Sequence, residues 1–127
     1  MFDELSTGQK RLVLIARALA SKAPLLLIDE PTSNLDLGNK YRVIHTLRRI
    51  VNERRVTVIA AGHDIDLALA SDWVVALKDG EVMAMGAPDD IINGKVLSEL
   101  YGVDVEVFDV DGHRLVYVRD DFGKSHH

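Results

Sequence analysis

The chain has 127 residues, of which 47% are hydrophobic and 28% are charged, a composition that suits one domain with a real core and excludes a disordered chain. Its formal net charge of -5 argues against a dedicated nucleic-acid binder, whose phosphate contacts need a basic surface. The lack of cysteine excludes disulfides and thiolate metal sites, and no apolar run approaches the roughly 20 residues that cross a bilayer. Met1 is followed by no basic region or apolar run, so we expect no secretory leader.

The first predicted element is a helix over residues 7–20. Ser6 and Gln9, three residues apart, form a capping box, and apolar residues then recur at helical spacing. The next element is a strand over residues 25–28, an uninterrupted apolar run between Pro24 and two carboxylates. Such a run is typical of a strand that is buried on both faces of a parallel sheet.

A second helix and a second strand follow. Asp36 predicts the N-cap of a helix that continues to about residue 53, because apolar residues again recur at helical spacing. Residues 56–61 are apolar and mostly β-branched, which predicts another buried strand, and Asp64 predicts the cap of a short helix ending near residue 70. The alternation of helix and strand indicates an α/β fold with a mostly parallel sheet.

The second half of the chain predicts two β-hairpins with short helices between them. The paired segments are 73–77 with 81–85 and 103–110 with 114–118. An Asp-Gly dipeptide lies between the strands of each pair, and it favours the positive backbone angles of a tight turn. Residues 88–101 predict one or two short helices, broken near Asn93.

Two carboxylates at the end of the first strand are candidate catalytic and metal-binding groups. A strand that ends in Asp29 and Glu30 places both at the carboxyl edge of the sheet, where open α/β folds bind ligands. Asp29 could hold Mg²⁺, which prefers carboxylate oxygen, and Glu30 could orient or deprotonate an attacking water. The alternative is that this acidic pair and Pro31 merely end a strand in a turn.

The start of the first helix is the candidate phosphate-binding element. Ser6 and the backbone N–H groups of Thr7, Gly8 and Gln9 would crowd the positive end of that helix, which suits a phosphate. Gly8 would also allow close approach of the backbone. The alternative is an ordinary helix cap.

His63 is the remaining candidate, because it directly follows the second predicted strand. As a neutral imidazole it could donate one N–H to a phosphate while its other nitrogen contacts a neighbouring group. Taken alone, a histidine in such a position is more often structural than catalytic. Its place after the two other motifs favours the catalytic interpretation.

These motifs carry a resemblance to a known family. Residues 25–36, LLLIDEPTSNLD, resemble the Walker B strand and D-loop of the ATP-binding-cassette (ABC) ATPases, and residues 5–9, LSTGQ, resemble their signature motif. His63 resembles the family's switch histidine. The match covers residues 1 to about 86, and it implies a P-loop NTPase fold, ATP and Mg²⁺ as cofactors, and ATP hydrolysis.

The resemblance also implies roles and a partner. His63 would sense the γ-phosphate, and Asp36 would be the D-loop aspartate that communicates across a dimer, although an N-cap role explains the same residue. The signature phosphate belongs, in this family, to the ATP held by the opposite subunit. A second ABC ATPase subunit is therefore expected in a head-to-tail dimer. Thr7 stands where the commonest form of the signature has glycine.

Two family elements do not occur in the sequence. No G-x-x-x-x-G-K-[ST] loop is present to cradle phosphates, and no Q-loop glutamine precedes the signature. We therefore interpret residues 1–122 as the C-terminal part of an ABC nucleotide-binding domain and residues 123–127 as a tail of added sequence. The chain alone is expected to have little ATPase activity, to need a Walker A-bearing half, and to leave apolar sheet faces and edges unpaired.

The end of the chain indicates a branch of the family. Residues 95–105, KVLSELYGVDV, are similar to the tail of ATPases that serve importers of metal chelates such as siderophores, haem and cobalamin. Such a subunit would lie in the cytoplasm, at the inner face of the cell membrane, beneath a membrane permease. Two alternatives stay open: a soluble ABC ATPase of DNA repair or translation, and a fragment that acts as an interaction module.

Overall fold

The computed structural model describes residues 2–119, with side chains from Thr7 onward. The predicted tail at 123–127 and the last residues of the predicted domain lie outside the described residues. The chain divides into two compact units, one up to Ala70 and one from Ser71 onward. Each unit has its own strands and its own buried residues.

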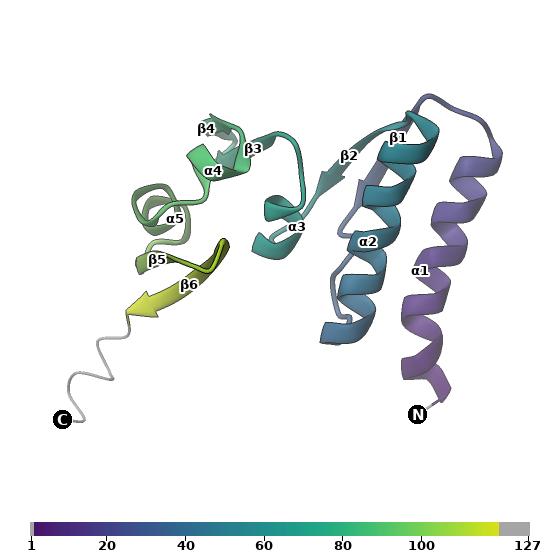
Figure 1. Ribbon diagram of the computed structural model, residues 1–127, viewed down its shortest axis with the longest axis horizontal. Helices are drawn as coiled ribbons and strands as arrows, with labels where there is room; N and C mark the ends of the chain where they lie inside the picture. The colour runs from purple at the N-terminus through teal and green to yellow at the C-terminus, as the bar shows by residue number, and fades with distance from the viewer. Residues whose placement is uncertain (1, 120–127) are drawn as a thin grey trace. The chain divides into compact units, whose positions relative to one another are not determined.

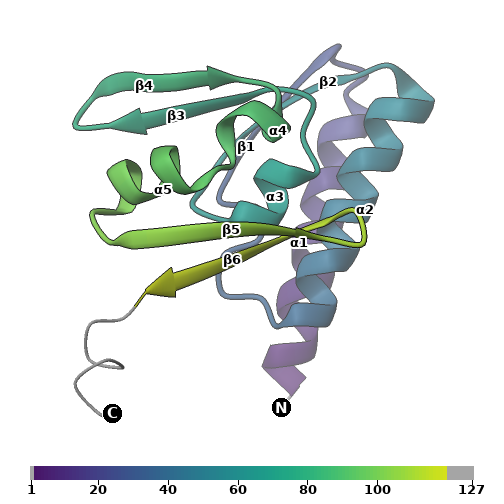
Figure 2. The ribbon, with the colours of Figure 1, turned by 60° about the vertical axis from the view of Figure 1, so that its left-hand side comes forward.

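The first unit alternates helix and strand. Its elements are α1 (Phe2–Ala20), β1 (Leu25–Asp29), α2 (Leu37–Arg54), β2 (Thr57–Ala61) and α3 (Ile65–Leu69). β1 and β2 pair in parallel, from Leu25 opposite Thr57 to Asp29 opposite Ala61. α1 and α2 pack side by side with their axes roughly parallel, as both Figure 1 and Figure 2 show.

One face of the β1–β2 pair packs on these helices. Ile15 of α1 and Val43, Leu47 and Ile50 of α2 form a buried cluster. Alternating residues of the two strands pack against it: Leu26, Ile28 and Val58. The three α2 residues recur at the spacing of one helix face, so α2 buries a single apolar stripe.

The prediction that both strands are buried on both faces is wrong. Leu25 and Leu27 of β1 are 45% and 69% exposed, and Ile59 of β2 is 55% exposed. α1 and α2 cover one face of the pair, and the parallel sheet of the described residues has only these two strands. The apolar residues of the opposite face therefore remain in contact with solvent. This confirms the expectation that an apolar face of the sheet is left unpaired.

The second unit consists of two hairpins and two short helices, seen most openly in Figure 2. Its elements are β3 (Val74–Lys78), β4 (Glu81–Gly86), α4 (Pro88–Ile91), α5 (Gly94–Tyr101), β5 (Asp104–Val110) and β6 (His113–Arg119). Both predicted hairpins are confirmed as antiparallel pairs. The α/β fold is confirmed, and parallel pairing among the described strands is confined to β1 and β2. None of the described helices is long and apolar enough to span a membrane.

The two hairpin turns have the geometry that their Asp-Gly sequences predict. Asp79 and Gly80 have φ values of 52° and 77°, and Asp111 and Gly112 have φ values of 51° and 79°. Two consecutive residues with positive φ are what a two-residue type I′ turn requires, and glycine adopts such angles without steric cost.

The predicted break near Asn93 is also confirmed. α4 ends at Ile91, and the Asn93 side chain caps α5 by accepting a 2.8 Å hydrogen bond from the Val96 backbone N–H. The buried apolar residues of this unit come from both helices, from the C-cap of α4 and from β3 and β5: Ala76, Ile91, Ile92, Leu97 and Val105.

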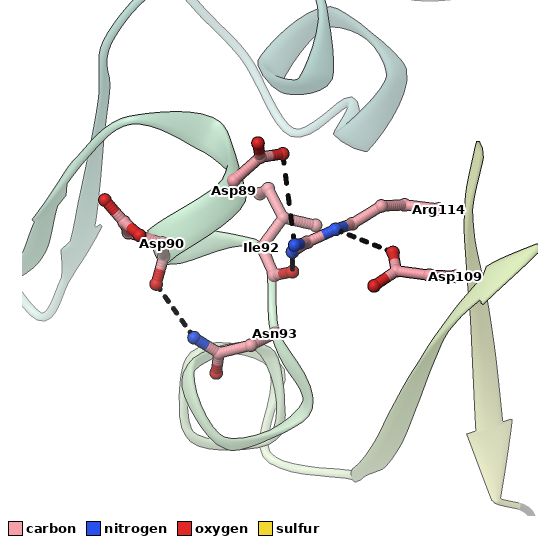
Figure 3. Close-up of polar contacts among 6 residues, drawn as sticks. All are labelled: Asp89, Asp90, Ile92, Asn93, Asp109 and Arg114. Atoms are coloured by element: carbon pink, nitrogen blue, oxygen red, sulfur yellow. Dashed lines mark hydrogen bonds and ion pairs between the residues drawn. The ribbon is translucent and has the colours of Figure 1, made fainter. Parts of the chain in front are cut away.

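An arginine of β6 joins the second hairpin to the short helices. The Arg114 guanidinium donates a hydrogen bond to the Ile92 carbonyl, its Nε lies 3.1 Å from Asp109 Oδ1, and its Nη2 lies 3.9 Å from Asp89 Oδ1 (Figure 3). The Arg114 side chain is 19% exposed. These acceptors therefore satisfy a charge that is largely removed from water.

Val43 provides a test of the core of the first unit. Its side chain is fully buried, so Val43→Ala leaves a cavity and should lower the free energy of unfolding by about 1–3 kcal/mol. Val13, an α1 valine that is 54% exposed, gives the matched control Val13→Ala, for which we expect a change below about 0.5 kcal/mol. Urea denaturation followed by circular dichroism measures both. Equal losses in the two variants would contradict the assigned core.

Candidate active site

Two acidic side chains lie at the carboxyl end of β1. Asp29 is the last residue of the strand and is exposed, and Glu30 follows directly. The Glu30 backbone N–H donates a 2.7 Å hydrogen bond to the carbonyl of Ala61, the last residue of β2. The structure thus places both carboxylates at the carboxyl edge of the parallel pair.

The structure brings His63 to this edge as well. Its Nε2 lies 3.1 Å from Glu30 Oε1. The Glu30 side chain is 35% exposed and the His63 side chain is 87% exposed, so water can reach both groups. The contact is a hydrogen bond when Nε2 carries the proton of a neutral ring, and an ion pair when the ring is charged. The roles of the two residues stay predictions.

The segment that carries His63 is held by α2 and α3. Asp64 caps α3, because its side chain accepts a 2.9 Å hydrogen bond from the Asp66 backbone N–H. Lys40 of α2 pairs with both acids, since its Nζ lies 2.8 Å from Asp66 Oδ2 and 3.6 Å from Asp64 Oδ1. The hydrogen bond to Asp66 raises the pKa of Lys40 above its ordinary value of 10.5. No signal in the sequence pointed to this lysine.

Arg11 of α1 binds the turn after Glu30, although no sequence pattern pointed to this residue. Its guanidinium donates hydrogen bonds to the carbonyls of Glu30, Pro31 and Ser33, at 3.1, 2.8 and 2.9 Å. Backbone carbonyls carry no sequence signature, so a cation that binds them cannot be recognised from residue types alone.

Asp36 has the N-cap role that the sequence predicted. Its side chain accepts a 2.8 Å hydrogen bond from the Asn39 backbone N–H at the start of α2. The carboxylate is exposed. Its role in communication across a dimer stays a prediction.

The prediction that the first helix begins at residue 7 is wrong. α1 begins at Phe2, so the N–H groups of Thr7, Gly8 and Gln9 lie inside the helix, where each bonds to the carbonyl four residues earlier. Residues 2–6 contain no glycine or proline, so the local sequence does not stop the helix before Ser6. These amides do not form the exposed phosphate-binding turn that the capping box predicted.

Gly8 is buried against α2. A Cβ built on Gly8 would lie 2.6 Å from Asn39 Cγ and 2.7 Å from Asn39 Oδ1, which is closer than non-bonded atoms approach. In this structure the glycine therefore allows close contact between two helices, whereas the sequence suggested close approach to a phosphate. Of its neighbours, Thr7 is partly buried and Gln9 is exposed.

The acidic edge fits the way in which proteins bind Mg²⁺. This ion usually takes one or two carboxylates, and waters and substrate phosphates complete its coordination. Among the described residues, no group of three or more His, Cys, Asp or Glu side chains could hold a metal by itself. The exposed Asp29, with Glu30 beside it, therefore suits a metal that is shared with a phosphate ligand.

Gly8→Ala tests the contact between α1 and α2. The new methyl group would overlap Asn39, so the free energy of unfolding should fall by about 1–3 kcal/mol, although alanine is the better helix former. Asn39→Ala removes the two closest atoms and should recover part of the loss in the double variant. Urea denaturation of the four proteins gives the coupling. An undiminished stability of Gly8→Ala would contradict the close contact.

Lys40 predicts a loss of stability at alkaline pH. The folded-state pKa of Lys40 is raised above 10.5. Its pairing with Asp66 and Asp64 therefore contributes fully to the free energy of unfolding below pH 10.5, and this contribution is lost as the pH rises through the folded-state pKa. Lys40→Met should remove this part of the pH dependence, whereas Lys10→Met, at an exposed lysine of α1, should retain it. Thermal melts between about pH 9 and about pH 11.5 make the comparison. An unchanged alkaline loss in Lys40→Met would overturn the assignment.

Comparison with known proteins identifies relatives. A model of the family described as "ABC transporter" matches residues 1–33. The energy-coupling factor transporter ATP-binding protein EcfA of Pediococcus pentosaceus is 40% identical over 102 residues, which are 80% of this chain and 36% of that protein. The hemin import ATP-binding protein HmuV of Rhodococcus jostii is 40% identical over 123 residues, which are 94% of this chain and 42% of that protein.

A solved structure gives the same result. It is described as a metal-chelate type ABC transporter in an inward-facing conformation, and it matches with a TM-score of 0.76 and 28% identity over 88% of this chain and 45% of that chain. The chain thus spans less than half the length of these relatives. Since the motifs, the fold and the relatives agree, the chain belongs to the ABC transporter ATPases.

Proposed function

We propose that the chain forms the part of an ABC transporter's ATP-binding subunit that carries the groups for hydrolysis. The observation that carries this proposal is the 3.1 Å contact between Glu30 Oε1 and His63 Nε2 at the carboxyl edge of β1 and β2. Phosphoryl transfer to water needs a group that orients the water and a group that contacts the phosphate. A carboxylate beside an imidazole can provide both.

Each residue of the edge has a role in this proposal. Glu30 orients the attacking water and accepts its proton, and its contact with His63 fixes the direction of the carboxylate. His63 contacts the γ-phosphate of ATP through an imidazole nitrogen. Asp29 holds Mg²⁺ directly or through water, and the bound ion neutralises charge on the phosphates.

The proposed role of the signature residues requires a backbone arrangement that differs from the one in this structure. We propose that Ser6, Thr7, Gly8 and Gln9 contact a phosphate of ATP held by a second subunit. Because the amides of residues 7–9 are engaged within α1, their use in phosphate binding requires the first turn of that helix to open. The exposed Gln9 side chain is accessible without such a change.

Residues outside the given sequence complete the proposed site. The sequence contains no Walker A loop, and that loop supplies the amides and the lysine that bind most of the phosphate charge. The proposal therefore includes a Walker A-bearing half, a second ABC ATPase subunit in a head-to-tail dimer, and little activity of the chain alone.

The cargo that we favour is a metal chelate. Residues 95–105, which form α5 and the start of β5, are similar to the tail of chelate-importer ATPases, and one relative is named for hemin import. EcfA, with equal identity, is named for an energy-coupling factor transporter, so the tail decides between the branches. Under this proposal the subunit binds a membrane permease at the inner face of the cell membrane.

Reconstitution tests the proposed function. The chain is mixed with an amino-terminal half that carries a Walker A loop, taken from a chelate-importer ATPase, and phosphate release is measured against ATP concentration. We expect saturable hydrolysis from the mixture and background from the chain alone. Glu30→Gln should lower kcat about 10²- to 10⁴-fold with little change in KM, because the carboxylate acts in the transition state.

Glu53→Gln is the matched control for this experiment. Glu53 lies near the end of α2, its side chain is 62% exposed, and it pairs only loosely with Arg49 at 3.8 Å. This variant should retain full activity. If the chain alone hydrolysed ATP with saturable kinetics, and Glu30→Gln abolished this activity, the proposal that the site is incomplete would be wrong. If no Walker A half from any branch of the family restored hydrolysis, the proposed function itself would be wrong.

A further inference from the structure

Arg11 makes several side-chain hydrogen bonds beside the candidate site. Its Nη1 donates to the Glu30 carbonyl at 3.1 Å and to the Pro31 carbonyl at 2.8 Å. Its Nη2 donates to the Ser33 carbonyl at 2.9 Å and approaches Ser33 Oγ at 3.4 Å. One side chain of α1 thus holds three carbonyls of the turn that follows β1.

The backbone that Arg11 holds is strained at Glu30. Glu30 has a φ of 51°, in the left-handed region, which is unfavourable for a residue with a side chain and persists only where the surroundings enforce it. The Glu30 carbonyl accepts from Arg11 and also from Ser33 Oγ at 3.1 Å and from the Ser33 N–H at 3.3 Å. On the other side, the Glu30 N–H is fixed to Ala61.

The chemistry of arginine suits this task better than that of any other side chain. Its guanidinium is planar and carries five N–H donors in a fixed fork, so it can satisfy several carbonyls that lie in different directions. The charge also strengthens each hydrogen bond. Lysine has the same charge but directs its donors from a single point, so it cannot hold all of these carbonyls in one arrangement.

We propose that Arg11 is a positioning residue that holds Glu30 in its left-handed conformation and thereby directs the Glu30 carboxylate toward His63. It acts through the Glu30 backbone and contacts neither the imidazole nor the carboxylate in this role. Its part in catalysis rests on the proposed function, whereas its effect on the Glu30–His63 contact does not. Since Arg11 lies two residues after Gln9 on α1, the helix that carries the signature is mechanically connected to the carboxylate.

The imidazole of His63 reports on this arrangement without any activity. We would record the ring ¹H–¹⁵N correlations of His63 by NMR in the unsubstituted chain and in the variants Glu30→Gln, Arg11→Met and the double variant. Glu30→Gln should shift the ring signals because it removes the charge beside Nε2. Arg11→Met should shift the ring signals in the same direction. In the double variant, adding Glu30→Gln to Arg11→Met should change the ring signals little further.

The matched control is Arg17→Met, which removes an exposed arginine from the same helix. It should leave the His63 ring signals and the response to Glu30→Gln unchanged. Amide signals of α2, which lies in the same unit as Arg11 and His63, show whether each variant is folded. If Arg11→Met does not fold, Arg11→Lys provides the comparison, and its ring signals should lie between those of the unsubstituted chain and Glu30→Gln.

The unsubstituted chain provides a measurement that cannot be lost to misfolding. The guanidinium protons of Arg11 should exchange with solvent several-fold more slowly than those of Arg17. Equal exchange rates, or an Arg11 variant that retains both the His63 ring signals and the full response to Glu30→Gln, would overturn the proposal. In the reconstituted ATPase, Arg11→Met should lower kcat and leave the KM for ATP unchanged. If the reconstituted ATPase shows no hydrolysis even without a substitution, the proposed function is contradicted. The NMR signals of the His63 ring then still decide whether Arg11 positions Glu30.

Discussion

The parallel pairing of β1 with β2 is the constraint on which the candidate site depends. Asp29 stands opposite Ala61, and the hydrogen bond from the Glu30 N–H to the Ala61 carbonyl extends the pairing by one residue. His63 follows two residues after Ala61, which places its ring within 3.1 Å of the Glu30 carboxylate. A slip of one residue would turn every side chain of the slipped strand to the opposite face and separate these groups.

The features that could be predicted from the sequence are those set by neighbouring residues. The caps at Asp36 and Asp64 form hydrogen bonds two or three residues along the chain, and the Asp-Gly turns are fixed by their own backbone angles. The order of the elements and the placement of Glu30 and His63 at one sheet edge follow from such local signals together with the rule that parallel strands share an edge.

The features that could not be predicted depend on residues far apart in the sequence. Arg11 reaches carbonyls 19 to 22 positions away, and Lys40 reaches an acid 26 positions away. Neither contact leaves a local pattern. The exposure of Leu27 was predicted wrongly for a related reason, because it depends on what covers the strand rather than on its own residues. The start of α1 was predicted wrongly because residues 2–6 contain nothing that stops a helix.

Gly8 shows how a motif residue can serve more than one physical requirement. The resemblance assigns it to a phosphate, and the structure packs it against Asn39. Both requirements exclude a side chain at that position, so the presence of glycine there cannot by itself distinguish ligand binding from helix packing.

The solvent-exposed leucines of β1 make the behaviour of this polypeptide depend on how much of it is present. Encounters between two copies increase with the square of concentration, and each encounter offers bare hydrocarbon and an unpaired strand edge to the other copy. Dilute preparations would therefore remain monodisperse for longer than crowded ones at the same temperature.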